Sequence, residues 1–278
     1  MRKLVQSQTA KRLKSLDREV RQVARKPKNA EAIHDLRVSI RRFRQELNVF
    51  EEWLKPGPVK RIRGTIKRLM ERCAAVRNCD IAIEVLQAAG YVSPKLVAGL
   101  EKERQHARKE LARTLAGWRR RDRVRKWRAH LRIVRPSSKS EVGGSVSENA
   151  RRLLTAMIED FFRAGREAAR PRSTHRRMHR LRLEAKRVRY TLELFESAYG
   201  ERTKPMVEPL KALQDKLGAI NDCATTLEML RRNRGAATAV RRLAGERETE
   251  FREHWKKHFG PRERVRWKAV LSAADGEK

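Results

Sequence analysis

Two basic segments of the chain carry the residues best suited to binding chemistry. The first holds His34, Arg37, Arg41, Arg42 and Arg44. The second, 145 residues later, holds His179, Arg182, Lys186, Arg187 and Arg189 at matching spacings. An α-helix turns about 100° per residue, so each histidine and the bases three, seven and ten residues after it share a stripe roughly 80° wide. Each segment therefore predicts a helix with four hydrogen-bond-donating side chains on one side.

The apolar residues of these segments cluster beside the basic stripe and not opposite to it. They are Leu36, Ile40, Phe43, Leu47, Phe50 and Leu54 in the first segment and Leu181, Val188, Leu192 and Phe195 in the second. Because the apolar face of a helix packs on the core, a stripe next to that face is expected to line a cavity or the wall of a groove. Arg42 and Arg187, about 80° round the helix, are included among the expected polyphosphate-binding residues, with a position facing another helix or water as the alternative.

A second repeated element follows each basic segment. Residues 66–79 match residues 210–223 at an offset of 144, and each copy carries a lysine followed by a small polar cluster. Asn and Asp in such a cluster favour a local cap or kink in a helix. We expect Lys67, Arg77 and Lys211 to close the binding site.

The chain is strongly basic. Its 278 residues include 69 Lys and Arg against 34 Asp and Glu, a formal net charge of +35. Such an excess opposes compaction through self-repulsion and indicates a polyanionic partner. Charge alone leaves nucleic acid, an anionic membrane surface and a chain of phosphates open. Since 39% of the residues are hydrophobic, the chain can bury a core, which excludes a disordered basic tail.

Cysteine usage and hydropathy predict the cellular compartment. Cys73, Cys79 and Cys223 are odd in number and form no C-x-x-C pair, so we expect reduced thiols and no disulfide. The first residues contain no apolar signal region, and no run of about 18 uncharged apolar residues occurs. We therefore expect a cytoplasmic protein with no membrane partner.

Helix-forming residues dominate and apolar alternation never persists, which predicts an all-α fold. Helices are expected at about 1–25, 30–55, 59–89, 94–133, 147–169, 173–199, 203–233 and 236–258. A Gly- and Ser-rich stretch marks the predicted domain boundary. The expected organisation is one repeat at 1–135, a linker at 136–146, a second repeat at 147–258 and a basic tail at 259–278. Such helices pack most simply as two antiparallel four-helix bundles, related by the internal repeat as a pseudo-two-fold molecule.

The combined pattern resembles the CHAD family, the conserved histidine α-helical domain. The resemblance rests on H-x-x-R-x-x-x-R-R-x-R at 34–44, on 76–80, on 179–190 and on 213–222, and it spans about residues 1–260. It implies a pair of four-helix bundles around a basic central cavity that binds inorganic polyphosphate without a catalytic step. The family usually shows Arg-Asp where this chain has Arg77-Asn78, which puts a salt bridge or a metal role at that position in doubt.

Polyphosphate presents charge but no base edges, so charge-assisted hydrogen bonds must carry its recognition, and the planar fork of arginine suits them. The expected primary contacts are Arg37, Arg41, Arg44, Arg182, Lys186 and Arg189. His34 and His179 are expected to contact phosphate or to order the basic side chains, with metal binding as the alternative and a neutral core histidine as the ordinary role of a lone example. Tyr190 lies beside the stripe, where it suits a phosphate contact or packing equally well.

Other functions have weaker support in the sequence. No P-loop, dinucleotide turn or zinc pattern occurs, so we expect no enzyme activity and no cofactor or required metal, although Asp80 and Asp222 could recruit divalent ions beside bound phosphate. The basic segment 119–135, next to Trp118 and interleaved with Trp127, is typical of a nucleic-acid surface, but both tryptophans could instead pack on the bundle. The sequence favours a polyphosphate binder recruited to polyphosphate granules. The alternatives are a nonspecific nucleic-acid-associated protein and, more weakly, a metal-dependent phosphohydrolase.

Overall fold

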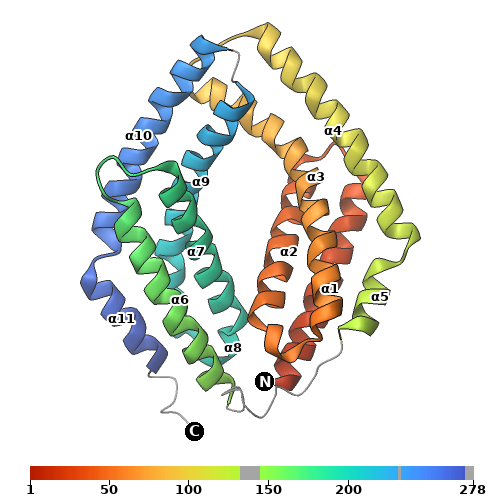
Figure 1. Cartoon of the computed structure of the whole chain (residues 1–278), viewed down its shortest axis with the longest axis vertical. Helices are drawn as coiled ribbons and strands as arrows, with labels where there is room; N and C mark the ends of the chain where they lie inside the picture. Colours follow the sequence, from red (N-terminus) through yellow and green to blue (C-terminus); the bar gives the residue numbers. More distant parts are fainter. Residues whose placement is uncertain (132–144, 231–232, 273–278) are drawn as a thin grey trace. The chain divides into compact units, whose positions relative to one another are not determined.

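The described part of the chain is built from helices alone, which confirms the all-α prediction (Figure 1). This computed structural model describes residues 1–131, 145–230 and 233–272. The α-helices are α1 (Arg2–Arg25), α2 (Ala30–Val49), α3 (Pro56–Ala88), α4 (Pro94–Arg120), α5 (Arg123–His130), α6 (Val146–Ala168), α7 (His175–Leu194), α8 (Glu196–Tyr199), α9 (Lys204–Met229), α10 (Arg234–His258) and α11 (Pro261–Ser272). Short 3-10 turns, η1 (Glu51–Trp53) and η2 (Gly200–Thr203), follow α2 and α8.

The chain divides into two compact units. The first comprises Met1–Ile83 and Ser93–Gly143, and the second comprises Glu84–Val92 and Gly144–Lys278. The end of α3 and the turn after it thus lie with the second unit. Two hydrogen bonds hold them there: the Tyr91 hydroxyl donates to Asn233 Oδ1 over 3.2 Å, and Arg242 Nη2 donates to the Ala89 carbonyl over 3.4 Å. The predicted linker at 136–146 falls mostly outside the described residues and stays a prediction.

In the first unit, α1 packs along α2, and α4 and α5 lie against α1 (Figure 1). The helix expected at 94–133 is interrupted, because Asp122 takes a left-handed conformation with φ 42° and α5 starts after it. A partly buried ion pair links α3 and α4, with Arg104 Nη1 3.0 Å from Asp80 Oδ1. Arg63 of α3 donates to the Leu47 carbonyl near the end of α2 over 2.9 Å.

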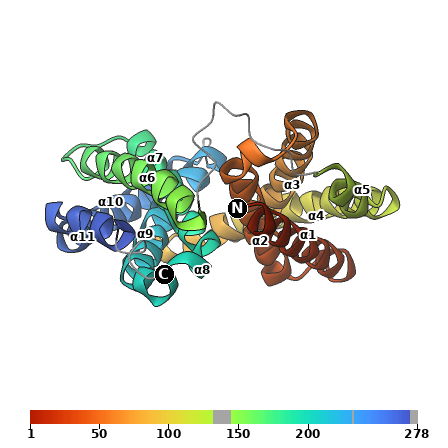
Figure 2. The same ribbon diagram turned by 90° about the horizontal axis from the view of Figure 1, so that it is seen from below.

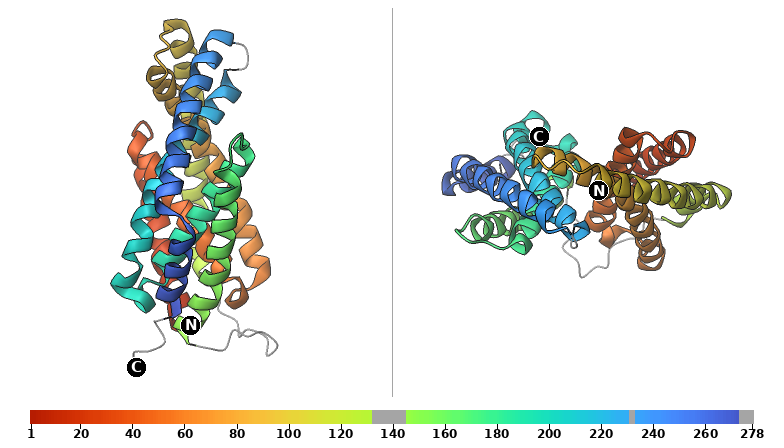
Figure 3. Two further views of the ribbon diagram at one scale, coloured as in Figure 1. Left: turned by 90° about the vertical axis from the view of Figure 1, so that its left-hand side faces the viewer. Right: turned by 90° about the horizontal axis from the view of Figure 1, so that it is seen from above.

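In the second unit, α6 packs on α7, α7 on α9, and α9 on α10 (Figures 2 and 3). The segment expected as a basic tail contains α11, which packs against α6. Trp267 of α11 is only 2% exposed and stacks on Phe161 of α6, with the two ring centroids 5.6 Å apart. The tail region thus adds a helix to the core of this unit.

The two helices that carry the basic segments begin with the same kind of cap. Asn29 Oδ1 accepts a hydrogen bond from the Ala32 amide over 3.0 Å at the start of α2. Thr174 Oγ1 accepts one from the Arg177 amide over 3.4 Å at the start of α7. These caps satisfy amides that have no partner within the helix and so fix where each basic segment begins. The apolar faces predicted for both helices are buried, as expected.

Candidate functional site

The basic stripe of α2, here called the first row, consists of His34, Arg37, Arg41 and Arg44. Burial lowers the pKa of His34, and the nearby positive charges of Arg41 and Arg37 lower this pKa further. These arginines therefore lie close enough to the imidazole to act on its charge. Arg41 and Arg44 form no ion pair with a described carboxylate, so the positive charge of these two arginines is not neutralised by the described residues.

The first row extends toward α3. Burial raises the pKa of Cys73 on α3 to about 12, and the charge of Arg37 opposes this rise. Two residues of α3 were predicted to close the site. Lys67 is 72% exposed and lies 4.0 Å from Glu71 Oε1, whereas Arg77 is half-buried. The ion-pair partner of Lys67 among the described residues is thus Glu71 on its own helix and not a member of the first row.

The matching stripe of α7, here called the second row, consists of His179, Arg182, Lys186 and Arg189. His179 Nδ1 lies 3.0 Å from Asn221 Oδ1, a hydrogen bond that links α7 to α9. His175, one turn earlier on α7, has its ring centroid 6.1 Å from that of His179. Burial and the neighbouring His179 lower the pKa of His175. The second row is thus anchored to α9 at its histidine.

Acidic neighbours neutralise part of the second row. Arg189 Nε lies 3.5 Å from Glu193 Oε1, and its guanidinium lies 4.9 Å from the ring centroid of Tyr190. Tyr190 is 6% exposed, which fits packing, while a contact of its hydroxyl with phosphate stays a prediction. Lys211 on α9 pairs with Glu208 over 2.7 Å. Since Asn48 occupies the position in α2 that Glu193 occupies in α7, the first row lacks this counter-charge.

Arg42 and Arg187 point away from the rows, toward a neighbouring helix. Arg42 lines a small cavity of about 180 Å³ together with Arg12 and Glu19 of α1. Arg187 lies 3.6 Å from Glu184 Oε2 and 4.0 Å from Asp160 Oδ2 of α6. These contacts fit the alternative that Arg42 and Arg187 face another helix, and their binding of polyphosphate stays a prediction.

Asn221 is the partner that the sequence-based site set lacks. It lies 42 residues after His179, so only the packing of α7 on α9 brings the two side chains together. The signal for it was the repeated polar cluster, in which Asn221 stands where the first copy has Arg77. A single cavity faced by both rows stays a prediction from the sequence.

Asp80 and the three cysteines are buried. Asp80 is 8% exposed and bound to Arg104, so its carboxylate is already paired. The three cysteines are free thiols, and all are buried. No group of three or more His, Cys, Asp or Glu side chains in the described ranges is placed to hold a metal ion.

The tryptophans of the basic region after α4 belong to the core. Trp118 and Trp127 are 4% and 7% exposed, and their ring centroids lie 5.0 Å apart. Trp127 also stacks on Phe43 of α2. The packing alternative is therefore confirmed for these two rings. None of the helices that the structure describes is long and apolar enough to cross a membrane.

The chain is similar to one protein family and to solved structures. The family model of the CHAD domain matches residues 7–231. The crystal structure of the CHAD domain from the plant Ricinus communis superposes with a TM-score of 0.68 and 20% sequence identity, covering 98% of this chain and 91% of that one. PptA from Streptomyces chartreusis superposes with a TM-score of 0.57 and 16% identity, covering 99% of each chain. A search of curated proteins found no match.

Proposed function

The chain belongs to the CHAD family, and from this membership and the geometry of its basic rows we propose that it binds inorganic polyphosphate. The proposed primary contacts are Arg37, Arg41, Arg44, Arg182, Lys186 and Arg189, assisted by His34 and His179. We further propose that binding, without catalysis, recruits a cytoplasmic protein to polyphosphate granules.

One observation carries this proposal: a row of donors lies beside a buried apolar face in each unit. In the first row, Arg41 is half-buried and makes no ion pair with a described residue. A half-buried guanidinium is poorly screened by salt and loses less rotamer freedom when it binds, which favours charge-assisted hydrogen bonds to phosphate oxygens. A solvated surface charge would offer neither advantage.

The available aromatic side chains favour inorganic polyphosphate over single-stranded nucleic acid. Stacking of bases on aromatic rings supplies much of the affinity for single strands. The exposed large hydrophobic side chains in the described residues are Val92, Leu183 and Val265, and none is aromatic. The described helices thus offer groups that can bind phosphate but little surface on which bases could stack. Nucleic acid remains the second candidate ligand, because the net charge of +35 would attract it.

A pair of charge-matched double variants tests the proposal. Arg41→Ala with Lys186→Ala removes one cation from each row. Lys256→Ala with Arg262→Ala removes the same charge from two exposed residues that form no ion pair in the described chain. Isothermal titration with long-chain polyphosphate should show a loss of about tenfold or more for the row variant, because each charge-assisted hydrogen bond contributes about 1.5–3 kcal/mol. The slope of affinity against salt should also become shallower.

The control variant should bind within about threefold of the wild type, since exposed charges contribute only about 0–1 kcal/mol. Circular dichroism should show unchanged helicity for both variants. Equal losses in the two variants would contradict localised binding at the rows and favour attraction by the overall charge.

A further inference from the structure

A second basic cavity lies in the first unit, where α1, α4 and α5 meet. It has a volume of about 640 Å³, within the range of about 300–1,000 Å³ that is usual for small-ligand sites. Its lining includes Asp17, Arg21, Trp118, Arg120, Asp122 and Arg123. The left-handed residue Asp122 separates α4 from α5, so the arginines on either side of the break line the same cavity.

The carboxylates of this cavity are already paired. Asp17 Oδ2 accepts a hydrogen bond from Arg21 Nε over 2.8 Å. Asp122 Oδ2 lies 2.6 Å from Arg125 Nε. Arg120 and Arg123 form no ion pair with a described residue, so these two guanidinium groups remain to bind an anion.

Positive charges crowd around Arg123. Burial lowers its pKa, and the charges of Arg121 and of Arg68 on α3 lower this pKa further. Like charges held this close repel one another, and an anion bound among them relieves the repulsion. The cluster therefore favours a ligand of high negative charge.

Trp118 gives an independent indication of the ligand. Its side chain is 4% exposed, and its Nε1 is a buried donor without a hydrogen-bond partner among the described residues. Most buried donors in proteins have a hydrogen-bond partner, so the unpaired Nε1 of Trp118 beside this cavity indicates that a polar ligand group accepts its hydrogen bond. The guanidinium of Arg123 lies over the ring of Trp118, 5.6 Å from its centroid. Because the ring is also buried, it offers little surface for a base to stack on.

We propose that this cavity is a second phosphate site of the first unit, which takes a short stretch of inorganic polyphosphate. The inference rests on the proposed function for the identity of the ligand, but on different residues. It predicts that the first unit contacts the polymer at two places.

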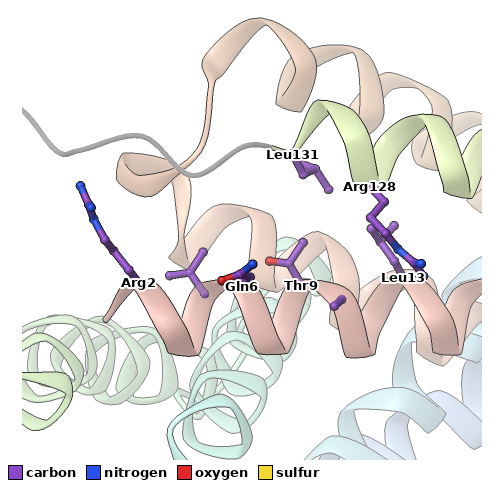
Figure 4. A pocket seen from close by; sticks show the side chains of 8 residues that line it. Arg2, Gln6, Thr9, Leu13, Arg128 and Leu131 are labelled. Atoms are coloured by element: carbon purple, nitrogen blue, oxygen red, sulfur yellow. The ribbon is translucent and has the colours of Figure 1, made fainter.

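A charge-matched control lies at the other end of α5. There an open cavity of about 530 Å³ runs between α1 and α5 (Figure 4). Arg2 and Arg128 stand at opposite ends of it, with Gln6 and Thr9 between them (Figure 4). Because these two arginines do not converge, they are expected to hold a compact anion poorly.

Titration of the full chain with inorganic tripolyphosphate tests the inference. Arg120→Gln with Arg123→Gln should weaken binding to the cavity by about tenfold or more, whereas Arg2→Gln with Arg128→Gln should leave it within about threefold. Arg120→Gln alone guards against misfolding, because Arg120 is exposed and forms no ion pair with a described residue. The ligand should also change tryptophan emission, and Trp118→Phe should remove that change.

Variants of the first row separate this inference from the proposed function. If Arg41→Ala with Arg44→Ala weakens binding and the Arg120 and Arg123 variant does not, the second site is overturned while the row proposal stands. If only the Arg120 and Arg123 variant weakens binding, the cavity stands and the row proposal fails. If neither variant weakens binding, both the second site and the row proposal are overturned. A single-stranded oligonucleotide that changes the emission at lower concentration than tripolyphosphate overturns the assignment of the ligand.

Discussion

Glu46 is a carboxylate in the core of the first unit, between α1 and α2. It is 2% exposed, and its Oε2 lies 3.5 Å from Arg12 Nε. Burial raises its pKa from 4.5 to about 7, although the Thr9 hydroxyl and the Arg12 charge oppose this rise. The folded chain therefore keeps this proton over a pH range in which the unfolded chain releases it.

This difference predicts that stability falls as pH rises from about 4.5 to about 7, because the folded state binds more protons in that window. As pH rises across this range, the raised pKa of Glu46 should lower the free energy of unfolding by about 3 kcal/mol, at about 1.4 kcal/mol for each unit of pKa difference. Denaturant unfolding at pH 5 and pH 8 should show Glu46→Gln gaining on the wild type as pH rises. The exposed Glu71→Gln is the control, and a parallel pH profile for both variants would contradict the prediction.

We expect His34 to make polyphosphate binding depend on pH. Burial and the charge of Arg41 lower its pKa in the free protein, and a phosphate oxygen at the ring would raise it in the complex. Binding then takes up a proton, so affinity for polyphosphate should increase as pH falls from 8 to 6. Calorimetry should show that His34→Gln flattens this slope. A slope that survives the substitution would assign His34 a structural role.

At the scale of the elements, α6 approaches α10 closely at one glycine of the second unit. Gly165 of α6 lies so close to Trp255 that a Cβ atom there would come within 1.7 Å of the indole ring. Trp255 is 6% exposed and belongs to an aromatic cluster with Phe161 and Phe259, so it has little room to shift. Only glycine fits at this crossing.

Gly165→Ala should destabilise the protein by about 1–3 kcal/mol or more through overpacking. Gly218→Ala in the interior of α9 is the matched control, since nothing lies within 4 Å of its added Cβ. That control should stabilise the helix by up to about 1 kcal/mol, because alanine is the better helix former. Thermal unfolding of both variants measures the contrast, and equal shifts in midpoint would refute this account of the crossing.

The elements also show how far local sequence patterns extend. The start of α2 at Ala30 and of α4 at Pro94 could be predicted, because caps and prolines act locally. The break at Asp122 could not, since a non-glycine residue in the left-handed region carries little sequence signal. Likewise α11 begins at a proline in a segment too basic to suggest burial, and its Trp267 reveals the core only once α6 is in place.

At the scale of the molecule, the basic stripes could be predicted from a repeat that spans both halves, but their partners could not. The hydrogen bond from His179 to Asn221 and the pairing of Arg189 with Glu193 decide how much charge each row offers. The hydrogen bond of His179 depends on the packing of α7 on α9. The partners Arg189 and Glu193 are close in sequence, but only the structure shows that they form a pair. A count of basic residues alone therefore overstates the positive charge that the second row offers.

The net charge of +35 attracts any polyanion, so selectivity must come from how the cations are arranged. Half-buried arginines such as Arg37 and Arg41 can be reached by a thin, flexible phosphate chain more readily than by a rigid duplex. At about 150 mM salt, where exposed charges are largely screened, bound long-chain polyphosphate should resist displacement by an excess of duplex DNA. Fluorescence anisotropy with labelled polyphosphate measures the competition. The Arg41→Ala and Lys186→Ala variant should lose this resistance, whereas the Lys256→Ala and Arg262→Ala control should keep it, and displacement of polyphosphate by equal charge equivalents of DNA from the wild type would refute selective binding at the rows.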